Sequence, residues 1–397
     1  MQPDAPRIAP DDTLWWLEEA EPAAAWLREK APVFEYQPGV RTVARYDDVR
    51  TVSRDPATFC SSKGVLVLDP LRSGHTSSPV DAPSVLFMDP PEHAQFRKLV
   101  SRAFTPRATA MMETAVRDRT LRILDEVPGP DIDLVEHIAV RLPLQMIAAL
   151  LGLDDVAETT FRFWSDETIK AADGLRADLS VVGEFVAFMM DGIAAHRAEP
   201  RDDILQLLVD AELDGRSLTD PELLVFCMSL LVAGNETTRN LISGGAVALA
   251  QHPDQRDWLA ANPAGIDHAV EEMLRWVTPI KAFARTATRD TTLAGSPIGE
   301  GDYLVMLYGS ANRDERAFGP TADHFDVRRR ADPAHLAFGF GEHLCLGASL
   351  ARLEARVVFE ELLRRAPRFE LAGTPVRLHS TLVNGWETVP VHLRTPQ

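Results

Sequence analysis

Apolar residues recur three and four positions apart along most of the chain. The pattern is clear at residues 136–151, 179–196, 221–250, 265–277 and 347–365. Side chains with this spacing share one face of an α-helix, so each range is predicted to be helical. Strand-like runs are short and are found at residues 41–46, 291–293 and 303–307 and near 389–393, with Gly and Pro around them. The pattern therefore predicts a mainly α fold with small β-sheets.

The chain shows no internal boundary that would divide it. It contains no repeat, low-complexity tract or long Gly/Ser linker, and its Pro-rich points are typical of turns. We therefore expect one domain covering residues 1–397. The stretch 60–84 is rich in Ser, Gly, Pro and Val and is long for a loop. It is either a lid beside a pocket or an irregular surface connection.

Composition and charge narrow the classes of function. Apolar residues make up 45% of the chain and charged residues 25%, which is ordinary for a globular protein. The 59 acidic residues outnumber the 41 basic ones, so a nucleic-acid partner is not expected. The most apolar segment, residues 223–234, is too short to span a bilayer, and the N-terminus does not resemble a signal peptide. We expect a soluble, cytoplasmic protein.

Cys345 is the cysteine best placed for chemistry. The three cysteines are far apart and odd in number, which argues against a disulfide framework. Cys345 follows a Gly-rich turn and precedes a predicted helix, whose positive end favours a thiolate. Phe338 is placed to cover the sulfur, and Gly347 removes a side chain where a flat macrocycle would approach. A lone cysteine is more often a buried apolar residue, so the whole arrangement carries the prediction.

A polar group interrupts the longest predicted helix. Thr219 and Glu222 form a capping box that starts this helix, so Glu236 and Thr237 lie near its middle. Taken alone, the group would be a solvated polar face, because Glu236 and Asn240 are four residues apart and share one side of the helix.

These segments together resemble those of a known family. The pattern Phe338-x-x-Gly-x-x-x-Cys345-x-Gly347, followed by Leu-Ala-Arg, resembles the haem-binding signature of the cytochrome P450 family. The resemblance runs from about residue 40 to the C-terminus, with the motifs in the expected order. It implies the cytochrome P450 fold, with haem b between the long central helix and the Cys345 loop. It also implies that Cys345 is the ligand of the haem iron.

The same resemblance assigns roles to further residues. Ala233 and Gly234 would leave room for dioxygen beside the haem. Thr237 would steady the bound oxygen, and Glu236 would belong to the route that delivers protons. The haem propionates need polar and cationic partners, for which the matching residues are His93, Arg97, Arg285 and His343.

Glu272 and Arg275 match the Glu-x-x-Arg motif of the family. Taken alone they would be an ordinary surface ion pair one helical turn apart. The resemblance makes them a buried structural pair that supports the thiolate loop. The third partner should come from three consecutive arginines, residues 328–330. Counting from Phe325 favours Arg329, and counting back from His335 favours Arg330.

The reaction implied by the resemblance is that of a bacterial haem-thiolate monooxygenase. One atom of O2 enters a C–H bond of a hydrophobic substrate, and the other leaves as water. A separate ferredoxin and ferredoxin reductase would supply the electrons, and we expect a monomer. The docking face for the ferredoxin is expected to be a local basic patch, formed by Arg97, Lys98, Arg102 and Arg352.

The substrate pocket is predicted by analogy and is mainly apolar. In their motifs, the segments resemble members that oxidise steroids, sterol side chains and branched lipids, while terpenoids remain open. Lys281 is placed either to bind a substrate carboxylate or to extend toward water. The predicted wall residues are Val65, Leu230, Ala233, Gly234, Ile280, Lys281, Phe283 and Val383.

Two alternatives from other classes remain. A peroxide-driven haem enzyme would not need the acid and hydroxyl at Glu236 and Thr237, and turnover with hydrogen peroxide alone would favour it. A non-catalytic haem or ligand-binding protein would share the Cys345 loop. Absence of NAD(P)H consumption with competent redox partners would favour that second alternative.

Overall fold

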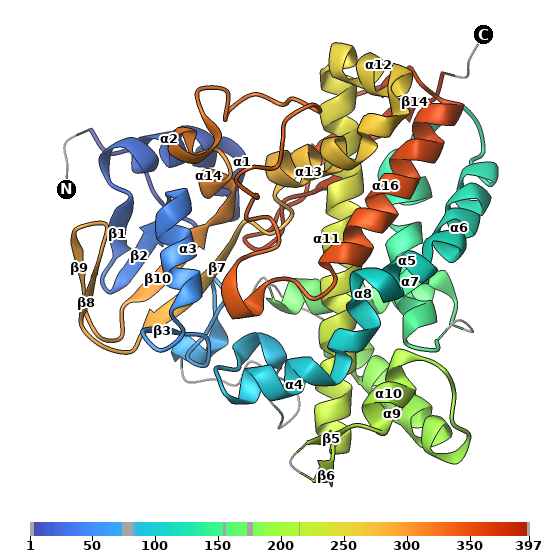
Figure 1. Cartoon of the computed structure of the whole chain (residues 1–397), viewed down its shortest axis with the longest axis horizontal. Coiled ribbons are helices and arrows are strands. Elements are labelled where there is room, and N and C mark those ends of the chain that lie inside the picture. The colour runs from blue at the N-terminus through green and yellow to red at the C-terminus, as the bar shows by residue number, and fades with distance from the viewer. Residues whose placement is uncertain are drawn as a thin grey trace.

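A long helix, α11 (Asp220–Gln251), runs through the molecule, and other helices pack along it (Figure 1). The computed structural model describes residues 4–73, 82, 84–153, 156–172, 178–213 and 215–394. The helices that contact α11 include α7 (Arg141–Leu150), α8 (Glu158–Ala172), α9 (Leu179–Ala198), α10 (Ile204–Val209), α12 (Pro253–Ala261), α13 (Ile266–Val277) and α16 (Ala348–Arg365). The mainly α prediction is confirmed.

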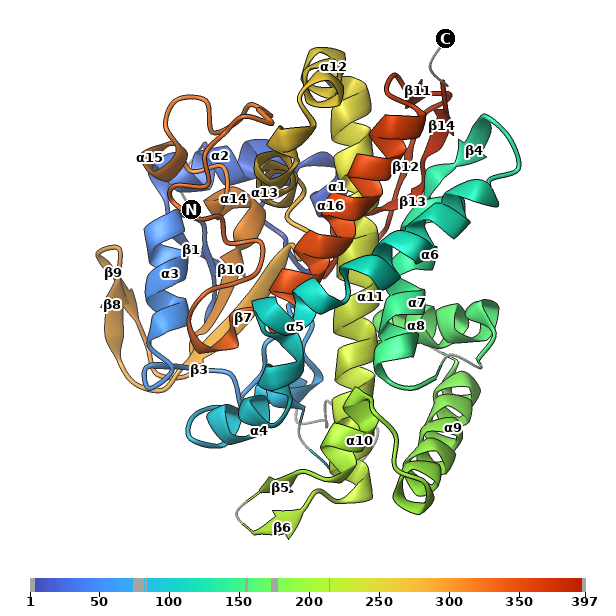
Figure 2. The ribbon, with the colours of Figure 1, turned by 45° about the vertical axis from the view of Figure 1, so that its right-hand side comes forward.

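The ends and crossings of α11 follow from its sequence. The predicted capping box is present, because Glu222 N–H donates to Thr219 Oγ1 and Thr219 N–H donates to Glu222 Oε2. Near its other end, a Cβ at Gly245 would stand 2.8 Å from Met273 Sδ and from Phe359 Cζ. Glycine therefore allows α13 and α16 to approach α11 closely, and Figures 1 and 2 both show α16 alongside it.

A five-stranded sheet forms a second layer beside the helical body. Its strand order is β1-β2-β10-β7-β3, with β2 and β10 parallel and the other pairs antiparallel. One face packs on α1 and α2 through Trp15 and Leu27, and the other face packs on α3 through Val49. The bounds are β1 (Val33–Gln37), β2 (Val40–Val43), β3 (Phe59–Cys60), β7 (Ala282–Ala287), β10 (Tyr303–Leu307), α1 (Thr13–Glu18), α2 (Ala20–Lys30) and α3 (Tyr46–Arg54).

The chain forms further helices and strands. The helices are α4 (Glu92–Ser101), α5 (Pro106–Met111), α6 (Glu113–Asp125), α14 (Tyr308–Ala311) and α15 (Glu315–Phe318). The strands are β4 (Asp131–Asp133), β5 (Glu212–Leu213), β6 (Arg216–Ser217), β8 (Thr291–Leu293), β9 (Ser296–Ile298), β11 (Glu370–Leu371), β12 (Val376–Arg377), β13 (Trp386–Thr388) and β14 (Pro390–His392). They form a three-stranded sheet, β11-β14-β4, and three two-stranded ones.

Several predicted boundaries need correction. The range 136–151 is not one α-helix: a π-helical turn at Val135–Ala139 precedes α7. Pro143 has no N–H to donate to residue 139, so an unbroken α-helix would lose a bond at that point. The predicted strand 41–46 ends at Val43, because Tyr46 begins α3. Of the loop at 60–84, the structure describes a 3₁₀ turn at Pro70–Ser73, whereas residues 74–81 and 83 lie outside the described residues.

None of the described helices combines the length with the apolar composition that crossing a bilayer requires.

Candidate haem site

Cys345 lies between a 3₁₀ turn (Gly341–His343) and the start of α16. Its N–H donates to the Phe338 carbonyl at 2.9 Å, and the Gly347 N–H donates to its sulfur. The residue is exposed, yet enough protein surrounds it that desolvation raises the pKa of the thiol. The Gly347 N–H and the charges of Arg97 and Arg352 act the other way and favour the thiolate.

The Gly-rich turn before Cys345 packs tightly against α3. Gly341 has φ +76, and a Cβ there would stand 2.2 Å from the backbone oxygen of Ser53. Gly339 also has positive φ. Glycines are therefore required for this path of the loop, as the sequence predicts.

His93, Arg97, Arg285 and His343 converge from three separate segments. His93 and Arg97 come from α4, Arg285 comes from β7, and His343 precedes Cys345 by two residues. The two imidazole rings are 4.0 Å apart. Arg97 donates to the Leu344 carbonyl, and the buried Arg285 donates to the Ala284 carbonyl. Within the described ranges, neither arginine has a carboxylate partner.

This arrangement calls for an anionic ligand. A buried guanidinium without a carboxylate partner is costly, and a carboxylate placed between Arg97 and Arg285 would remove that cost. Burial, Arg285, His93 and Arg97 lower the pKa of His343 to about 3, so it is a neutral hydrogen-bonding group at pH 7. His93, His343 and Glu342 are also close enough to hold a metal ion, but the two arginines oppose a cation there.

The donor set therefore fits the haem that the resemblance implies. Cys345 offers the iron one sulfur ligand, and the two arginines offer partners for propionates. Two residues near these partners were not predicted. Ser61 Oγ lies 3.1 Å from His343 Nε2, and burial raises the pKa of Glu342. Ser61 lies in an irregular loop, where no periodic pattern marks it.

The polar group in α11 is buried rather than solvated. Glu236 is 2% exposed and Asn240 is fully buried, which rules out the solvated polar face. Arg239 Nη1 lies 3.1 Å from Glu236 Oε2, and Asn240 Nδ2 lies 3.4 Å from Glu236 Oε1. Burial raises the pKa of Glu236, although Arg239 opposes this. Thr237 is partly exposed and its hydroxyl donates to the Ala233 carbonyl at 2.8 Å.

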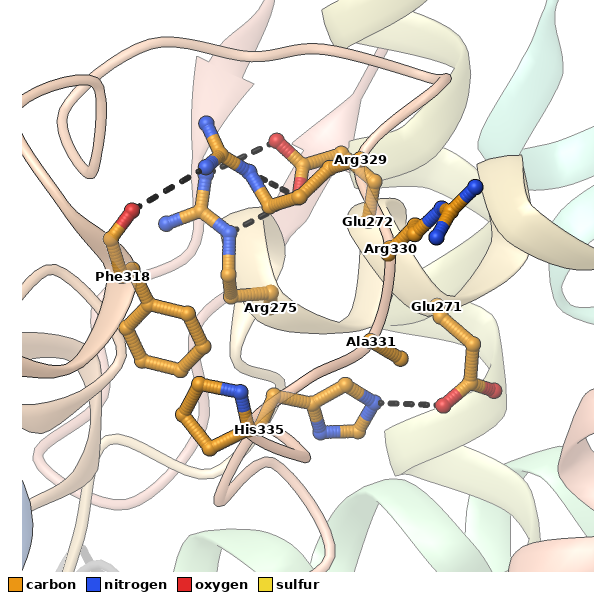
Figure 3. A pocket seen from close by; sticks show the side chains of 9 residues that line it. Glu271, Glu272, Arg275, Phe318, Arg329, Arg330, Ala331 and His335 are labelled. Atoms are coloured by element: carbon orange, nitrogen blue, oxygen red, sulfur yellow. Dashed lines mark hydrogen bonds and ion pairs between the residues drawn. The ribbon is translucent and has the colours of Figure 1, made fainter.

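Glu272 and Arg275 form a buried ion pair (Figure 3). Arg275 also donates to the carbonyls of Asn312, Ala322 and His324. Arg329 Nε lies 3.1 Å from Glu272 Oε2. Of the three consecutive arginines, Arg329 thus makes the third contact, while Arg328 pairs with Asp326 and Arg330 lines the adjacent cavity.

The predicted pocket residues fall into two sets, one on α11 and the other in or near the start of β7. Ile280 pairs with Val383 in an isolated β-bridge, and the Val65 carbonyl accepts from the N–H of Ala284, next to Phe283. Gly234 faces α7, where a Cβ would stand 3.2 Å from Ile147 Cδ1. Lys281 Nζ donates to the Ser380 carbonyl at 2.6 Å and lies 5.3 Å from the Trp16 ring centre. Leu230 is partly buried on α11 against the helical core.

Comparisons with known proteins show which family this chain belongs to. Residues 266–377 match the family model described as Cytochrome P450. The "Methyl-branched lipid omega-hydroxylase" of Mycobacterium tuberculosis is 36% identical over 94% of this chain and 89% of that protein. The "Steroid C26-monooxygenase" of Mycolicibacterium smegmatis is 34% identical over 94% of this chain and 92% of that protein.

Solved structures show the same fold. A cytochrome P450 of Mycobacterium marinum, in complex with pseudoionone, has a TM-score of 0.86 and 35% identity, covering 96% of this chain and 97% of that one. A structure from Novosphingobium aromaticivorans has a TM-score of 0.88 and 30% identity, covering 99% of both chains. This chain therefore belongs to the cytochrome P450 family and is a haem-binding monooxygenase.

Proposed function

We propose that this enzyme inserts one oxygen atom from O2 into a C–H bond of a steroid, terpenoid or other lipid-like molecule, with Cys345 as the iron ligand. The observation that carries the proposal is the surroundings of Cys345. Its thiol is exposed and accepts a hydrogen bond from the Gly347 N–H. Arg97 and Arg285, which have no carboxylate partner among the described residues, lie in the same site. The names of the relatives, which mention branched lipids, steroids and linalool, favour this substrate class.

Each group around the site has a proposed task. Bound haem supplies dioxygen reduction and oxygen transfer. Cys345 Sγ donates electron density to the iron, while Arg97 and Arg285 bind the propionates. Ala233, Phe338 and Gly347 border the haem. His93 and His343 would donate hydrogen bonds to the propionates.

Proton delivery is assigned to Glu236 and Thr237. Burial raises the pKa of Glu236, so its carboxyl can hold a proton at a higher pH than an exposed acid. Its oxygens face Arg239 and Asn240, so the side chain or a water molecule must carry the proton toward Thr237. Thr237 Oγ1 donates its hydrogen to the Ala233 carbonyl. The lone pairs of the Thr237 oxygen are therefore left to accept hydrogen bonds.

The electron donor is proposed to be a separate acidic ferredoxin, served by its reductase. Lys98 and Arg102 are exposed in and just after α4, the helix from which Arg97 donates to the carbonyl of Leu344. Leu344 is 45% exposed beside Cys345. A basic rim around an exposed apolar residue suits an acidic partner. We also propose that residues 1–397 act as one domain, as a cytoplasmic monomer.

The test combines isotope labelling with a choice of oxidant. The purified protein is supplied with an acidic ferredoxin, its reductase, NAD(P)H, a steroid or terpenoid and ¹⁸O₂. The proposal predicts a product that carries one ¹⁸O atom and depends on the reductase. Equal turnover with hydrogen peroxide and no reductase would instead establish the peroxide-driven reaction. Substrate binding without NAD(P)H consumption would establish a non-catalytic protein.

A further inference from the structure

We propose that the ion pair between Arg352 and Glu271, stacked on Phe338, tunes the reduction potential of the haem from the Cys345 side. In this proposal Arg352 raises the potential, Glu271 lowers it, and the two opposing charges set its value. The inference rests on Cys345 being the iron ligand, as proposed above.

The pair has a fixed geometry that joins two helices. Arg352, on α16, places Nε 2.5 Å from Glu271 Oε1 and Nη2 3.1 Å from Glu271 Oε2. Glu271 belongs to α13. The Arg352 guanidinium carbon lies 4.6 Å from the centre of the Phe338 ring. Two parallel bonds on one edge and an aromatic ring against one face leave the guanidinium little freedom.

The stack is connected directly to the cysteine. The Phe338 carbonyl accepts the Cys345 N–H at 2.9 Å, so the residue that carries the ring also holds the cysteine backbone. Arg352 lies in the second turn of α16, a helix that begins three residues after Cys345. A cation that stabilises negative charge on the sulfur also stabilises the electron added when the iron–thiolate unit is reduced. A nearby carboxylate has the opposite effect.

His335 makes a second contact with Glu271. The Ala337 N–H donates to His335 Nδ1 at 3.2 Å, which leaves Nε2 to face Glu271. That Nε2 lies 3.3 Å from Glu271 Oε2. Figure 3 marks this contact with a dashed line. Burial by itself raises the pKa of Glu271, but its bonds to His335 and Arg352 outweigh burial and hold the pKa at about 2. Glu271 therefore stays ionised at any working pH.

The sign of each charge gives a test that a structural role would not pass. Five variants of the haem-loaded protein are compared by spectroelectrochemical titration of the haem: Arg352→Gln, Glu271→Gln, the double variant, Arg352→Lys and Arg356→Gln. Arg356 lies one turn further along α16 and pairs with Glu113 at 2.7 Å, so it is the matched control. Arg352→Lys retains the charge and serves as the conservative variant.

We expect Arg352→Gln to shift the potential in the negative direction and Glu271→Gln to shift it in the positive direction. The double variant should return toward the wild-type value, and Arg356→Gln and Arg352→Lys should stay close to it. Shifts of the same sign in both single variants, or none larger than that of Arg356→Gln, would overturn the proposal. The carbon monoxide spectrum reports ligation separately: a wild-type protein without a thiolate band would refute the ligand assignment itself.

Discussion

Glu236 Oε2 lies 3.1 Å from Arg239 Nη1, one turn further along α11. The same Arg239 nitrogen lies 3.6 Å from Oδ1 of Asp166, a residue of α8. The Asp166 side chain is 36% exposed. One guanidinium therefore links a buried acid to an acid that reaches the surface. Arg239 Nε and the Oδ1 atoms of Asn235 and Asn240 are buried and have no hydrogen-bond partner in the described part of the chain. Ordered water commonly satisfies such atoms.

Replacing Glu236 by Gln should slow oxygen transfer. The amide retains the size and the contact with Asn240 but cannot hold the proton, so product formation should fall about 100-fold, within the usual range for a general acid. The rate of product formation, measured with saturating redox partners, checks this. Glu199 is exposed, so Glu199→Gln is the control. If Glu236→Gln formed product at the wild-type rate, Glu236 would not belong to the proton route.

Replacing Thr237 by Ala should leave haem and substrate binding intact but divert reducing equivalents to hydrogen peroxide. The lost hydroxyl is the one bonded to the Ala233 carbonyl, beside the proposed oxygen site. The ratio of product to NAD(P)H consumed is the measurement. The neighbouring Thr238→Ala, which removes a buried hydroxyl, should keep the wild-type ratio, and unchanged coupling in Thr237→Ala would contradict the assignment.

Two of the three consecutive arginines, Arg328 and Arg329, should differ sharply in their effect on stability. Arg329 contacts the buried Glu272, so Arg329→Ala should cost about 1–3 kcal/mol. The Arg328 side chain is 55% exposed and pairs with Asp326, so Arg328→Ala should cost at most about 0.5 kcal/mol. Denaturant unfolding of the haem-loaded protein measures both. Equal losses in the two variants would mean that the contact with Glu272 contributes little.

Replacing Gly341 by Ala should prevent stable haem incorporation. The new Cβ would meet the Ser53 oxygen at 2.2 Å, and positive φ adds about 1–3 kcal/mol of strain. The ratio of haem to protein after purification is the readout. Gly309→Ala, with nothing within 4 Å of its Cβ, should retain the wild-type ratio. A fully loaded Gly341→Ala protein would show that the loop can move away from α3.

Glu354 should make the protein less stable at high pH. It is buried on α16, its Oε2 has no partner, and burial raises its pKa from 4.5 to about 8. The folded state therefore keeps a proton that the unfolded state loses above pH 4.5. Stability is lost as the pH rises toward and through 8, by on the order of a few kcal/mol.

Glu354→Gln should remove this loss. Thermal unfolding midpoints of the wild type and the variant are compared at pH 6 and pH 9. The difference should favour the variant more at pH 9, whereas the exposed Glu387→Gln should follow the wild type. Parallel profiles for Glu354→Gln and the wild type would mean that the buried carboxyl does not titrate in this range.

Helix ends and strands that depend on residue spacing and turn residues could be predicted from the sequence. The capping box at Thr219 and the strands at 291–293 and 303–307 were predictable because spacing and turn residues determine them. The choice of Arg329 over Arg330 was not, since a loop between α15 and the Cys345 turn sets which arginine reaches Glu272. Contacts across distant segments, such as Arg239 with Asp166 or Arg352 with Phe338, leave no pattern in the sequence around them.

The most direct test of the central claim is the carbon monoxide difference spectrum of the purified, dithionite-reduced protein. Ligation of the iron by Cys345 predicts a strongly red-shifted Soret band that is absent from the Cys345→Ala variant. A haem-loaded protein without that band, or a variant that keeps it, would contradict the assignment of Cys345 as the ligand.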